Sequence, residues 1–406
     1  MKKILVTGGT VFVSRYIAEY YVKNGCDVYV LNRNSKEQSY GVNLIQADRH
    51  NLGETLRDFN FDVVIDTAYN CNDVEMLLDA LGDYKDYVLI SSSAVYPEYS
   101  EQPFKEDSLF GVNKYWGKYG TDKIEAEAAL LKRNPNAYVL RPPYLYGQMN
   151  NVYREAFVFD CALANRKFYL PKDGKMKLQF FHINDLCRFI DVLLKKRPDQ
   201  RIFNVGNKDT VTIQKWVELC YQATGKQAEF VNVYDDIEQR NYFSFYNYEY
   251  CLDVSKQYDL MPEVKPLYQG LKESFDWYKN NTDKVNKKPY IDYIENKLKV
   301  TRTREQTVTI CGSMKFEKEM QRIAFLLEAK HNMNVLQCVY NVDDLDITPT
   351  EQVALENAHY RKIELSDAIY VVDIQGYIGN QVSKEIAFAK NKGKKVIFHS
   401  EYSREK

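Results

Sequence analysis

The chain has 406 residues, which is too long for one compact core and predicts two or three domains. Its 55 Lys and Arg nearly balance 56 Asp and Glu, and the net charge of -1 disfavours nucleic acid or an anionic membrane as a partner. The 8 cysteines show neither a C-x-x-C pair nor a metal-like spacing, which predicts free thiols in a reducing compartment and implies no metal site.

The first 150 residues alternate short β-branched runs with segments of helical length. The runs are KILVTG, DVYVLN, VNLIQA, DVVIDTA, DYVLISS and AYVLRPP. This alternation predicts a doubly wound parallel α/β sheet of the Rossmann type. The first residues are two lysines and a short apolar run, unlike a signal peptide, and no apolar run reaches membrane-spanning length, so we expect a cytoplasmic protein.

The rest of the chain predicts a lobe, a linker and a second domain. Residues 151–298 are less regular and richer in aromatics, so we expect mainly a substrate lobe there, with residues 1–150 mainly binding the dinucleotide. Within the lobe, the aromatic run at 241–250 predicts a half-buried strand, with substrate stacking as the alternative. A polar segment at 299–305 predicts a linker. Residues 306–406 then predict a second, smaller Rossmann-like α/β domain.

The segment TGGTVFVSR, residues 7–15, lies where a dinucleotide-binding loop is expected. Of the three glycines in the usual spacing only Gly8 is present, and Val11 and Ser14 take the other two places. Ser14 is small enough for close packing of helix and strand, whereas Val11 resists positive φ and adds bulk near the phosphates. The helix N-terminus still offers N–H groups to an anion, so we expect a dinucleotide to bind. The expected contacts are Gly8, Thr10, Phe12 and Val13.

Two further segments carry residues suited to proton transfer. Tyr119 and Lys123 are four residues apart in a helix-compatible segment, so their side chains are expected on one face. A nearby cation favours the phenolate, which lets such a pair act as base or acid near neutral pH. Ser92 and Ser93 follow a buried-looking strand, where a hydroxyl can orient a substrate alcohol or carbonyl.

Taken in order, TGGTVFVSR, SSSAVY, YGTDKIEAE, LRPPYLYG and QFFHINDL resemble the extended short-chain dehydrogenase/reductase family, which includes the nucleotide-sugar epimerases and dehydratases. The resemblance covers residues 1 to about 298. It implies that Tyr119 is the catalytic acid/base, that Lys123 lowers its pKa and binds the nicotinamide ribose, and that Ser92 is their hydroxyl partner. Ser93 and Ala94 stand where the family's dehydratases usually carry an Asp-Glu pair, which favours epimerisation or carbonyl reduction.

The choice of cofactor depends on the end of the second predicted strand, where an acidic residue would bind the ribose 2′-hydroxyl. Asn32 and Arg33 stand there instead, and Arg33 suits a 2′-phosphate, so NADP is favoured over NAD. The same resemblance makes His182 and Asp185 non-catalytic, with Asp185 capping the following helix. It also implies further cofactor contacts at Asp48, Thr67 and Ala68.

The C-terminal segment from 366 to 398 predicts a strand, a glycine-bearing loop and a helix. Glu385 borders the apolar stripe of that helix, where a carboxylate beside a pocket can act as a glycosyl nucleophile. The region resembles the nucleoside 2-deoxyribosyltransferase superfamily, in which the glutamate of a comparable loop and helix is the nucleophile. Gly379 and Asn380 stand where true transferases usually carry an aspartate, so the resemblance leaves transfer itself open.

Three functions therefore remain open. The first is an NAD(P)-dependent epimerase or reductase acting on a nucleotide-activated sugar or a related carbonyl or alcohol, joined to a domain that binds nucleotides or cleaves N-glycosidic bonds. The second is an atypical dehydrogenase-like module that binds RNA or a protein partner. The third is a nucleoside or NAD glycosidase whose N-terminal domain senses the dinucleotide. A homodimer is compatible with the sequence.

Overall fold

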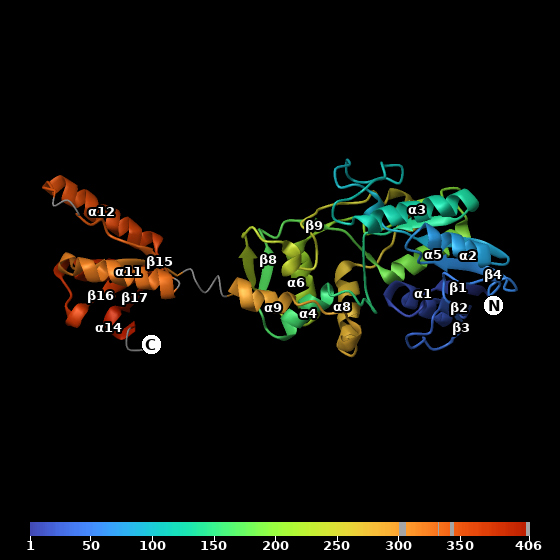
Figure 1. The fold of residues 1–406 in the computed structure, drawn as a ribbon, viewed down its shortest axis with the longest axis horizontal. Helices are drawn as coiled ribbons and strands as arrows, with labels where there is room; N and C mark the ends of the chain where they lie inside the picture. The colour runs from blue at the N-terminus through green and yellow to red at the C-terminus, as the bar shows by residue number, and fades with distance from the viewer. Residues whose placement is uncertain (300–305, 332, 342–344, 403–406) are drawn as a thin grey trace. The chain divides into compact units, whose positions relative to one another are not determined.

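The computed structural model describes residues 1–299, 306–331, 333–341 and 345–402 (Figure 1). The chain divides into two compact units, Met1–Tyr290 and Ile291–Lys406. Most of the predicted linker, residues 300–305, lies outside the described residues. Each unit has its own parallel sheet and is described by itself.

The first unit is built on a seven-stranded sheet in the order β11-β6-β5-β4-β1-β2-β3, in which all neighbouring strands are parallel. Its strands are β1 (Lys3–Thr7), β2 (Asp27–Asn32), β3 (Val42–Gln46), β4 (Phe61–Asp66), β5 (Tyr84–Ile90), β6 (Tyr138–Arg141) and β11 (Ile202–Asn204). Strands β1 to β6 coincide with the predicted β-branched runs, and the doubly wound parallel fold is confirmed. The strand order reverses at β1, so the carboxyl ends of β1 and β4 flank the crevice in which such sheets bind ligands.

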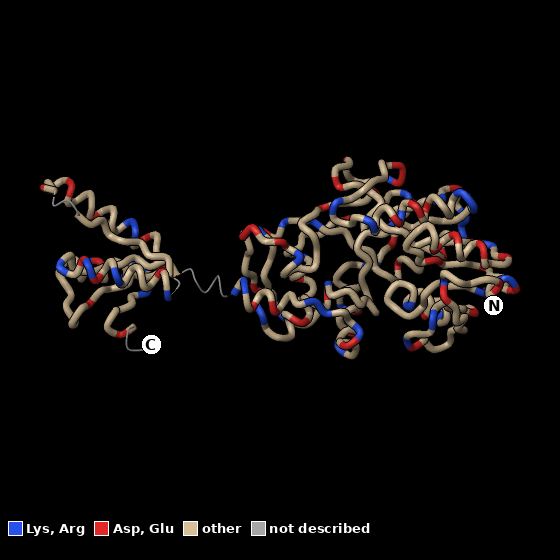
Figure 2. The backbone as a smooth tube through the Cα atoms, in the orientation of Figure 1, with Lys and Arg blue, Asp and Glu red and all other residues tan. Residues whose placement is uncertain are grey.

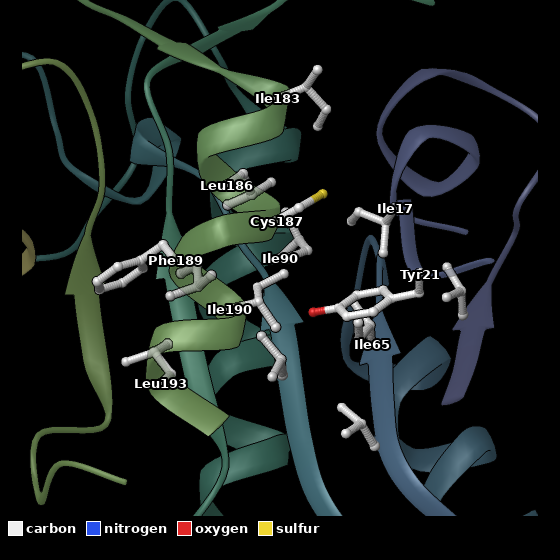
Figure 3. Packing of buried hydrophobic residues seen from close by; sticks show 14 of the residues in the cluster. Ile17, Tyr21, Ile65, Ile90, Ile183, Leu186, Cys187, Phe189, Ile190 and Leu193 are labelled. Atoms are coloured by element: carbon white, nitrogen blue, oxygen red, sulfur yellow. The ribbon is translucent and has the colours of Figure 1, made fainter. Parts of the chain in front are cut away.

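Helices cover both faces of this sheet because each strand buries residues on both sides. Helices α1 (Phe12–Lys23) and α5 (Ile183–Lys196) pack on one face, and α2 (Cys71–Ala80) and α3 (Lys118–Arg133) pack on the other. Figure 3 shows Cys187 and Ile190 of α5 beside Ile17 and Tyr21 of α1. Strand β11 therefore belongs to the large sheet and α5 packs on it, although both lie after residue 150, in the part of the chain predicted to be mainly a substrate lobe.

The remaining part of the first unit forms a smaller lobe with short sheets. Three pairs of strands are present, β7 (Tyr144–Tyr146) with β10 (Phe180–His182), β8 (Phe168–Pro171) with β13 (Phe230–Val233), and β9 (Lys177–Leu178) with β12 (Val211–Thr212). Its helices are α4 (Glu155–Leu163), α6 (Ile213–Ala223), α7 (Ser255–Leu260) and α8 (Leu267–Tyr278). The strand predicted at 241–250 is wrong, because this segment is irregular and its aromatic rings are mostly buried in the lobe.

Helix α5 differs from expectation at its first turn. His182 is the N-cap, and its Nδ1 atom accepts a hydrogen bond from the Asn184 N–H at 3.2 Å. Asp185 lies within the first turn of the helix, where its carboxylate accepts from the Lys265 N–H at 2.7 Å and pairs with Arg188 at 2.8 Å. The prediction that Asp185 caps the helix is therefore wrong, although its role in the structure is still one of support.

The second unit has a four-stranded parallel sheet in the order β15-β14-β16-β17. Its strands are β14 (Gln306–Gly312), β15 (Met333–Leu336), β16 (Ala368–Val372) and β17 (Lys395–Phe398). Its helices are α11 (Glu317–His331), α12 (Pro349–Leu365), α13 (Asn380–Asn391) and α14 (His399–Tyr402). Helix α9 (Tyr290–Tyr293) crosses the division between the units, and its first residue, Tyr290, packs on Tyr153 and Phe157 of the first unit. A capping box of Thr348 and Glu351 starts α12. The predicted second, smaller Rossmann-like domain is confirmed.

Charges of both signs are interspersed along each unit, as Figure 2 shows. Among the described helices, none combines the length and the apolar composition needed to cross a membrane.

Candidate functional site

The loop between β1 and α1 depends on two consecutive glycines. Gly8 and Gly9 have φ values of 87° and 84°, and a Cβ atom at Gly9 would lie 2.5 Å from Val30. Val11 has an extended backbone with φ of -138°, so the expected conflict between its β-branched side chain and a positive φ does not occur. The loop instead places a positive φ of 28° at Phe12.

The residues after the glycines bring the start of α1 close to the loop. Ser14 is buried, its hydroxyl donates to the Val11 carbonyl at 3.1 Å, and a Cβ atom at Gly8 would lie 2.9 Å from its oxygen. Val11 provides no side-chain cap for α1, so the first N–H groups of this helix remain available to an anion. Thr10 and Val13 are half-buried beside the loop, whereas the Phe12 ring packs in the core. This narrow glycine cradle fits a dinucleotide pyrophosphate.

Asn32 and Arg33 have different surroundings at the end of β2. The Asn32 amide donates to the Gly8 carbonyl at 2.6 Å and exchanges hydrogen bonds with Gln38, so it ties the glycine loop to β2. Arg33 is exposed, and within the described residues its side chain has no hydrogen bond or ion pair. Its guanidinium is therefore available to a phosphate group.

The other predicted cofactor residues lie at the carboxyl ends of β3 and β4. Asp48 is exposed and accepts from the His50 N–H at 3.0 Å. The Thr67 N–H donates to the Thr7 hydroxyl at 2.9 Å, and that hydroxyl donates to the buried Asp66 carboxylate at 2.7 Å. These bonds hold the ends of β1 and β4 together. Ala68 follows, fully buried, with its carbonyl oxygen directed to Lys123.

The structure brings the three predicted catalytic residues of the first unit together at the end of β5. Ser92 accepts from the Ala94 N–H at 3.1 Å at the start of the short helix η1 (Ser93–Val95), and its hydroxyl lies near enough to the Tyr119 phenol on α3 to influence its pKa. Lys123, one turn later, donates to the Ala68 carbonyl at 2.5 Å, and its Nζ atom lies 5.9 Å from the centre of the Tyr119 ring. Ser93 points elsewhere, with its hydroxyl 3.1 Å from that of Tyr250.

The two titratable groups of this set have shifted pKa values. Desolvation of the phenol raises the pKa of Tyr119, although the residue as a whole is 38% exposed, and the nearby Ser92 hydroxyl and the charge of Arg154 act in the opposite direction. Burial lowers the pKa of Lys123 to about 8. The cation that lowers the pKa of Tyr119 is thus Arg154, while Lys123 is held by the carbonyls of Ala68 and Ile90.

A buried ion pair fixes α3 against the sheet. Glu127 lies one turn beyond Lys123 and pairs with Arg141, the last residue of β6, at 2.5 Å between Oε2 and Nη2. The Ser91 hydroxyl donates to the same carboxylate, and all three side chains are buried. Because Ser91 precedes Ser92, this pair aligns α3 with the end of β5 and so holds Tyr119 opposite Ser92.

The sequence analysis missed several of these residues. Arg154 precedes α4, and its guanidinium lies 4.9 Å from the centre of the Tyr144 ring. Tyr250 belongs to the aromatic run that was predicted as a strand. Neither residue has a local pattern that marks it. Glu127 does have a signal, since it lies on the same helical face as Tyr119 and Lys123.

In the second unit, Glu385 lies on α13 at the wall of a cavity of about 1240 Å³. The residue is buried, and its Oε2 atom is 3.6 Å from Nε2 of His359 on α12. The cavity wall also includes Gly379 and Asn380, the loop pair of the sequence analysis, and Gly312 and Ser313 at the end of β14.

The strand order, the glycine cradle at its reversal point and the Ser-Tyr-Lys set define a dinucleotide-binding α/β protein. The model of the NAD dependent epimerase/dehydratase family matches residues 4–206, and the chain belongs to this family. The family resemblance inferred for the first unit is thereby confirmed. The second unit lies outside the matched residues.

Relatives show the same relationship over a longer part of the chain. The chloroplast stem-loop binding protein of 41 kDa b from Arabidopsis thaliana is 26% identical over 310 residues, covering 70% of this chain and 79% of the relative. UDP-N-acetyl-alpha-D-glucosaminuronate decarboxylase from Bacillus cytotoxicus is 23% identical over 320 residues, covering 68% and 98%. The structure of UDP-glucuronic acid 4-epimerase from Bacillus cereus with UDP-glucuronic acid and NAD has a TM-score of 0.54 at 21% identity, covering 68% of this chain and 99% of that one. This last likeness is one of fold.

Proposed function

We propose that residues 1–298 form an NAD(P)-dependent epimerase or reductase acting on a nucleotide-activated sugar or a related carbonyl or alcohol. The observation that carries this proposal is the grouping of Ser92, Tyr119 and Lys123 at the same sheet edge as the glycine cradle. Family membership supports it, and two of the similar proteins are named for UDP-sugars.

Each residue of the set has a distinct role in this proposal. Tyr119 donates a proton to the substrate carbonyl oxygen during reduction, which suits a phenol whose pKa is raised by burial. In the oxidation direction the deprotonated form of Tyr119, which the charge of Arg154 favours, takes the proton of the substrate hydroxyl, while Ser92 orients that oxygen. The nicotinamide cofactor, when bound, accepts or returns the hydride. Ser93 and Ala94 offer no carboxylate for a dehydration step, which favours epimerisation or reduction.

The cofactor is held at the glycine loop in this proposal. Gly8, Thr10 and the backbone of Phe12 and Val13 would surround the pyrophosphate at the start of α1. Lys123 would bind the nicotinamide ribose. At the other end of the cofactor, Arg33 favours NADP over NAD, and further contacts would come from Asp48, Thr67 and Ala68.

The experiment uses the full chain with NAD or NADP and a panel of nucleotide sugars that includes UDP-glucose and UDP-glucuronic acid. Products are separated by chromatography, and cofactor binding is measured by calorimetry. We expect conversion of a nucleotide sugar and binding of at least one of the two cofactors. Absence of cofactor binding together with absence of any conversion would contradict the proposal.

A second function is favoured by the position of Glu385. Its buried carboxylate at the wall of the large cavity supports a unit that binds a nucleoside or nucleotide and cleaves its N-glycosidic bond, with Glu385 attacking C1′ and the base leaving. Chromatography of free base after incubation of the full chain with deoxynucleosides or NAD tests this proposal. Glu385→Gln keeps the size of the side chain and should abolish release. Equal release by both proteins would remove Glu385 from this role.

The two remaining alternatives, an RNA-binding module and a glycosidase that senses a dinucleotide, predict different experimental results. The relative from Arabidopsis thaliana is named for binding a stem-loop, but the interspersed charges of this chain provide little support for binding RNA. Salt-dependent retention of a labelled RNA hairpin would support that alternative. A glycosidase with a dinucleotide-sensing first unit would instead show base release that responds to NAD or NADP and no conversion of nucleotide sugars.

A further inference from the structure

Three side chains with metal-binding atoms meet in the core of the second unit. They are Cys311 of β14, His359 of α12 and Glu385 of α13, and their ligand atoms all lie within 4.8 Å of one another. The Cys311 Sγ atom is 3.5 Å from His359 Nε2, and that nitrogen is 3.6 Å from Glu385 Oε2. The spacing of cysteines along the sequence does not reveal this cluster, because it contains a single cysteine and its members come from separate elements.

Two of the three separations fit the edges of a small tetrahedral site. Zinc binds thiolate, imidazole and carboxylate at about 2.0 to 2.3 Å, and tetrahedral neighbours at such distances lie roughly 3.3 to 3.6 Å apart. The observed 3.5 Å between sulfur and nitrogen and 3.6 Å between nitrogen and oxygen match those edges. A metal ion could therefore enter with small shifts of the side chains.

The surroundings of the carboxylate also favour a cation. Glu385 is buried, and its neighbours are the Cys311 thiol and the His359 ring. In the described part of the chain, no Lys or Arg pairs with Glu385. A buried carboxylate is stabilised by a positive partner, and a divalent ion would supply one.

We propose that Cys311, His359 and Glu385 bind one divalent transition metal ion of the zinc class. His359 and Glu385 line the cavity of about 1240 Å³, whereas Cys311 is fully buried, so the fourth ligand position faces the cavity and is available to water or to a bound molecule. The inference goes beyond the proposed epimerase or reductase, and it competes with the proposed glycosidic activity for Glu385. A carboxylate that ligates a metal does not attack a sugar, so metal binding and the nucleophilic role of Glu385 exclude each other.

The groups that surround the three proposed ligands determine the expected affinity for the metal ion. The Nδ1 atom of His359 is buried and has no hydrogen-bond partner in the described ranges. A metal-binding histidine usually gives its second nitrogen to an acceptor, and loss of that contact weakens binding by roughly 10- to 100-fold. We therefore expect an exchangeable ion, held less tightly than a structural zinc.

The test is a titration of the tag-free, chelator-treated full chain with Co²⁺, followed by optical absorption and then by displacement with Zn²⁺. We expect one equivalent of Co²⁺ with a thiolate-to-metal charge-transfer band. Cys311→Ser should lose the band, and Glu385→Gln and His359→Gln should each weaken binding about 10-fold or more. Cys338→Ser and Glu317→Gln change other residues of the cavity wall and should leave both the band and the affinity unchanged.

Circular dichroism of each variant checks that it is folded, and Glu385→Gln provides a test that changes neither size nor the buried sulfur. The proposal is overturned if wild type shows no thiolate band, or if the band survives in Cys311→Ser, or if folded Glu385→Gln binds as wild type does. Base release is measured separately in the metal-free chain, so its absence would count against the glycosidic proposal and leave the metal result unaffected.

Discussion

At the scale of single residues, the proposed chemistry rests on how burial changes two titratable groups in opposite ways. It raises the pKa of Tyr119, which keeps the phenol protonated, and it lowers the pKa of Lys123 to about 8, which brings the ammonium within reach of deprotonation near neutral pH. Arg33 differs from both, because it is exposed and its charge is permanent.

Lys123 should make cofactor binding depend on pH. The ammonium form binds the ribose and the anionic cofactor favours it, so binding raises a pKa that is about 8 in the free chain. We expect affinity to be constant below about pH 8 and to fall as the pH rises above that value. Calorimetric titrations from pH 6 to pH 10 measure this, with Lys123→Met as the variant that should bind weakly at every pH. A wild-type affinity that stays level through this range would show that the ammonium is not needed.

Arg33 should determine the preference between the two cofactors. Its guanidinium suits a 2′-phosphate, so Arg33→Ala should weaken binding of NADP by roughly 1 to 3 kcal/mol more than binding of NAD. Lys36→Ala removes a neighbouring exposed cation and serves as the control. Equal losses for NADP and NAD in Arg33→Ala would mean that this side chain remains in solvent.

At the scale of the elements, two features place the site, namely the tight passage from β1 to α1 and the docking of α3 on the sheet. The first requires glycine because Gly9 combines a positive φ with a close approach to Val30. The second requires the ion pair of Glu127 with Arg141, which lies between α3 and β6.

The requirement at Gly9 can be separated from the cost of a positive φ alone. Gly25 has a φ of 75° and nothing within 4 Å of a Cβ atom, whereas a Cβ at Gly9 would lie 2.5 Å from Val30. Gly25→Ala should therefore cost about 1 to 2 kcal/mol in free energy of unfolding, and Gly9→Ala should cost more and also weaken cofactor binding. Denaturant unfolding and calorimetry measure both. Similar losses of stability in the two variants would argue against the close packing.

The ion pair of Glu127 with Arg141, between α3 and β6, should contribute strongly to the free energy of unfolding. Glu127→Gln leaves the Arg141 charge buried without its partner, which should cost about 3 to 5 kcal/mol in free energy of unfolding. Glu125→Gln changes an exposed carboxylate on the same helix and should cost little. Chemical denaturation of both variants gives the comparison. A small loss in Glu127→Gln would mean that α3 is held mainly by its apolar contacts.

At the scale of the whole molecule, the features that could be predicted from the sequence are those that depend on a local pattern of residues. The β-branched runs marked β1 to β6 because buried parallel strands are apolar on both faces. The set of Ser92, Tyr119 and Lys123 was found because family motifs keep their order along the chain. Contacts between distant segments produce no local pattern in the sequence. Arg154 beside Tyr119, and the cluster that contains His359 and Glu385, exist only once the chain has folded.

The dependence on local pattern also explains the predictions that were wrong. The aromatic run at 241–250 alternates like a strand, but burial in an irregular segment produces the same pattern. Val11 was expected to resist a positive φ in a loop that still binds a dinucleotide, because the spacing alone does not show which residues carry a positive φ. The structure assigns those values to Gly8, Gly9 and Phe12.

The most direct test of the central claim is the effect of Tyr119→Phe on the full chain, measured as turnover of the best nucleotide sugar and as cofactor affinity. The substitution removes only the phenolic hydroxyl that transfers the proton, so turnover should fall by roughly 10² or more while the cofactor Kd stays within a few-fold of wild type. Tyr40→Phe, at a tyrosine that is 98% exposed, is the control and should change neither quantity. Turnover close to that of wild type in Tyr119→Phe would contradict the assignment of Tyr119 as the acid/base of this enzyme.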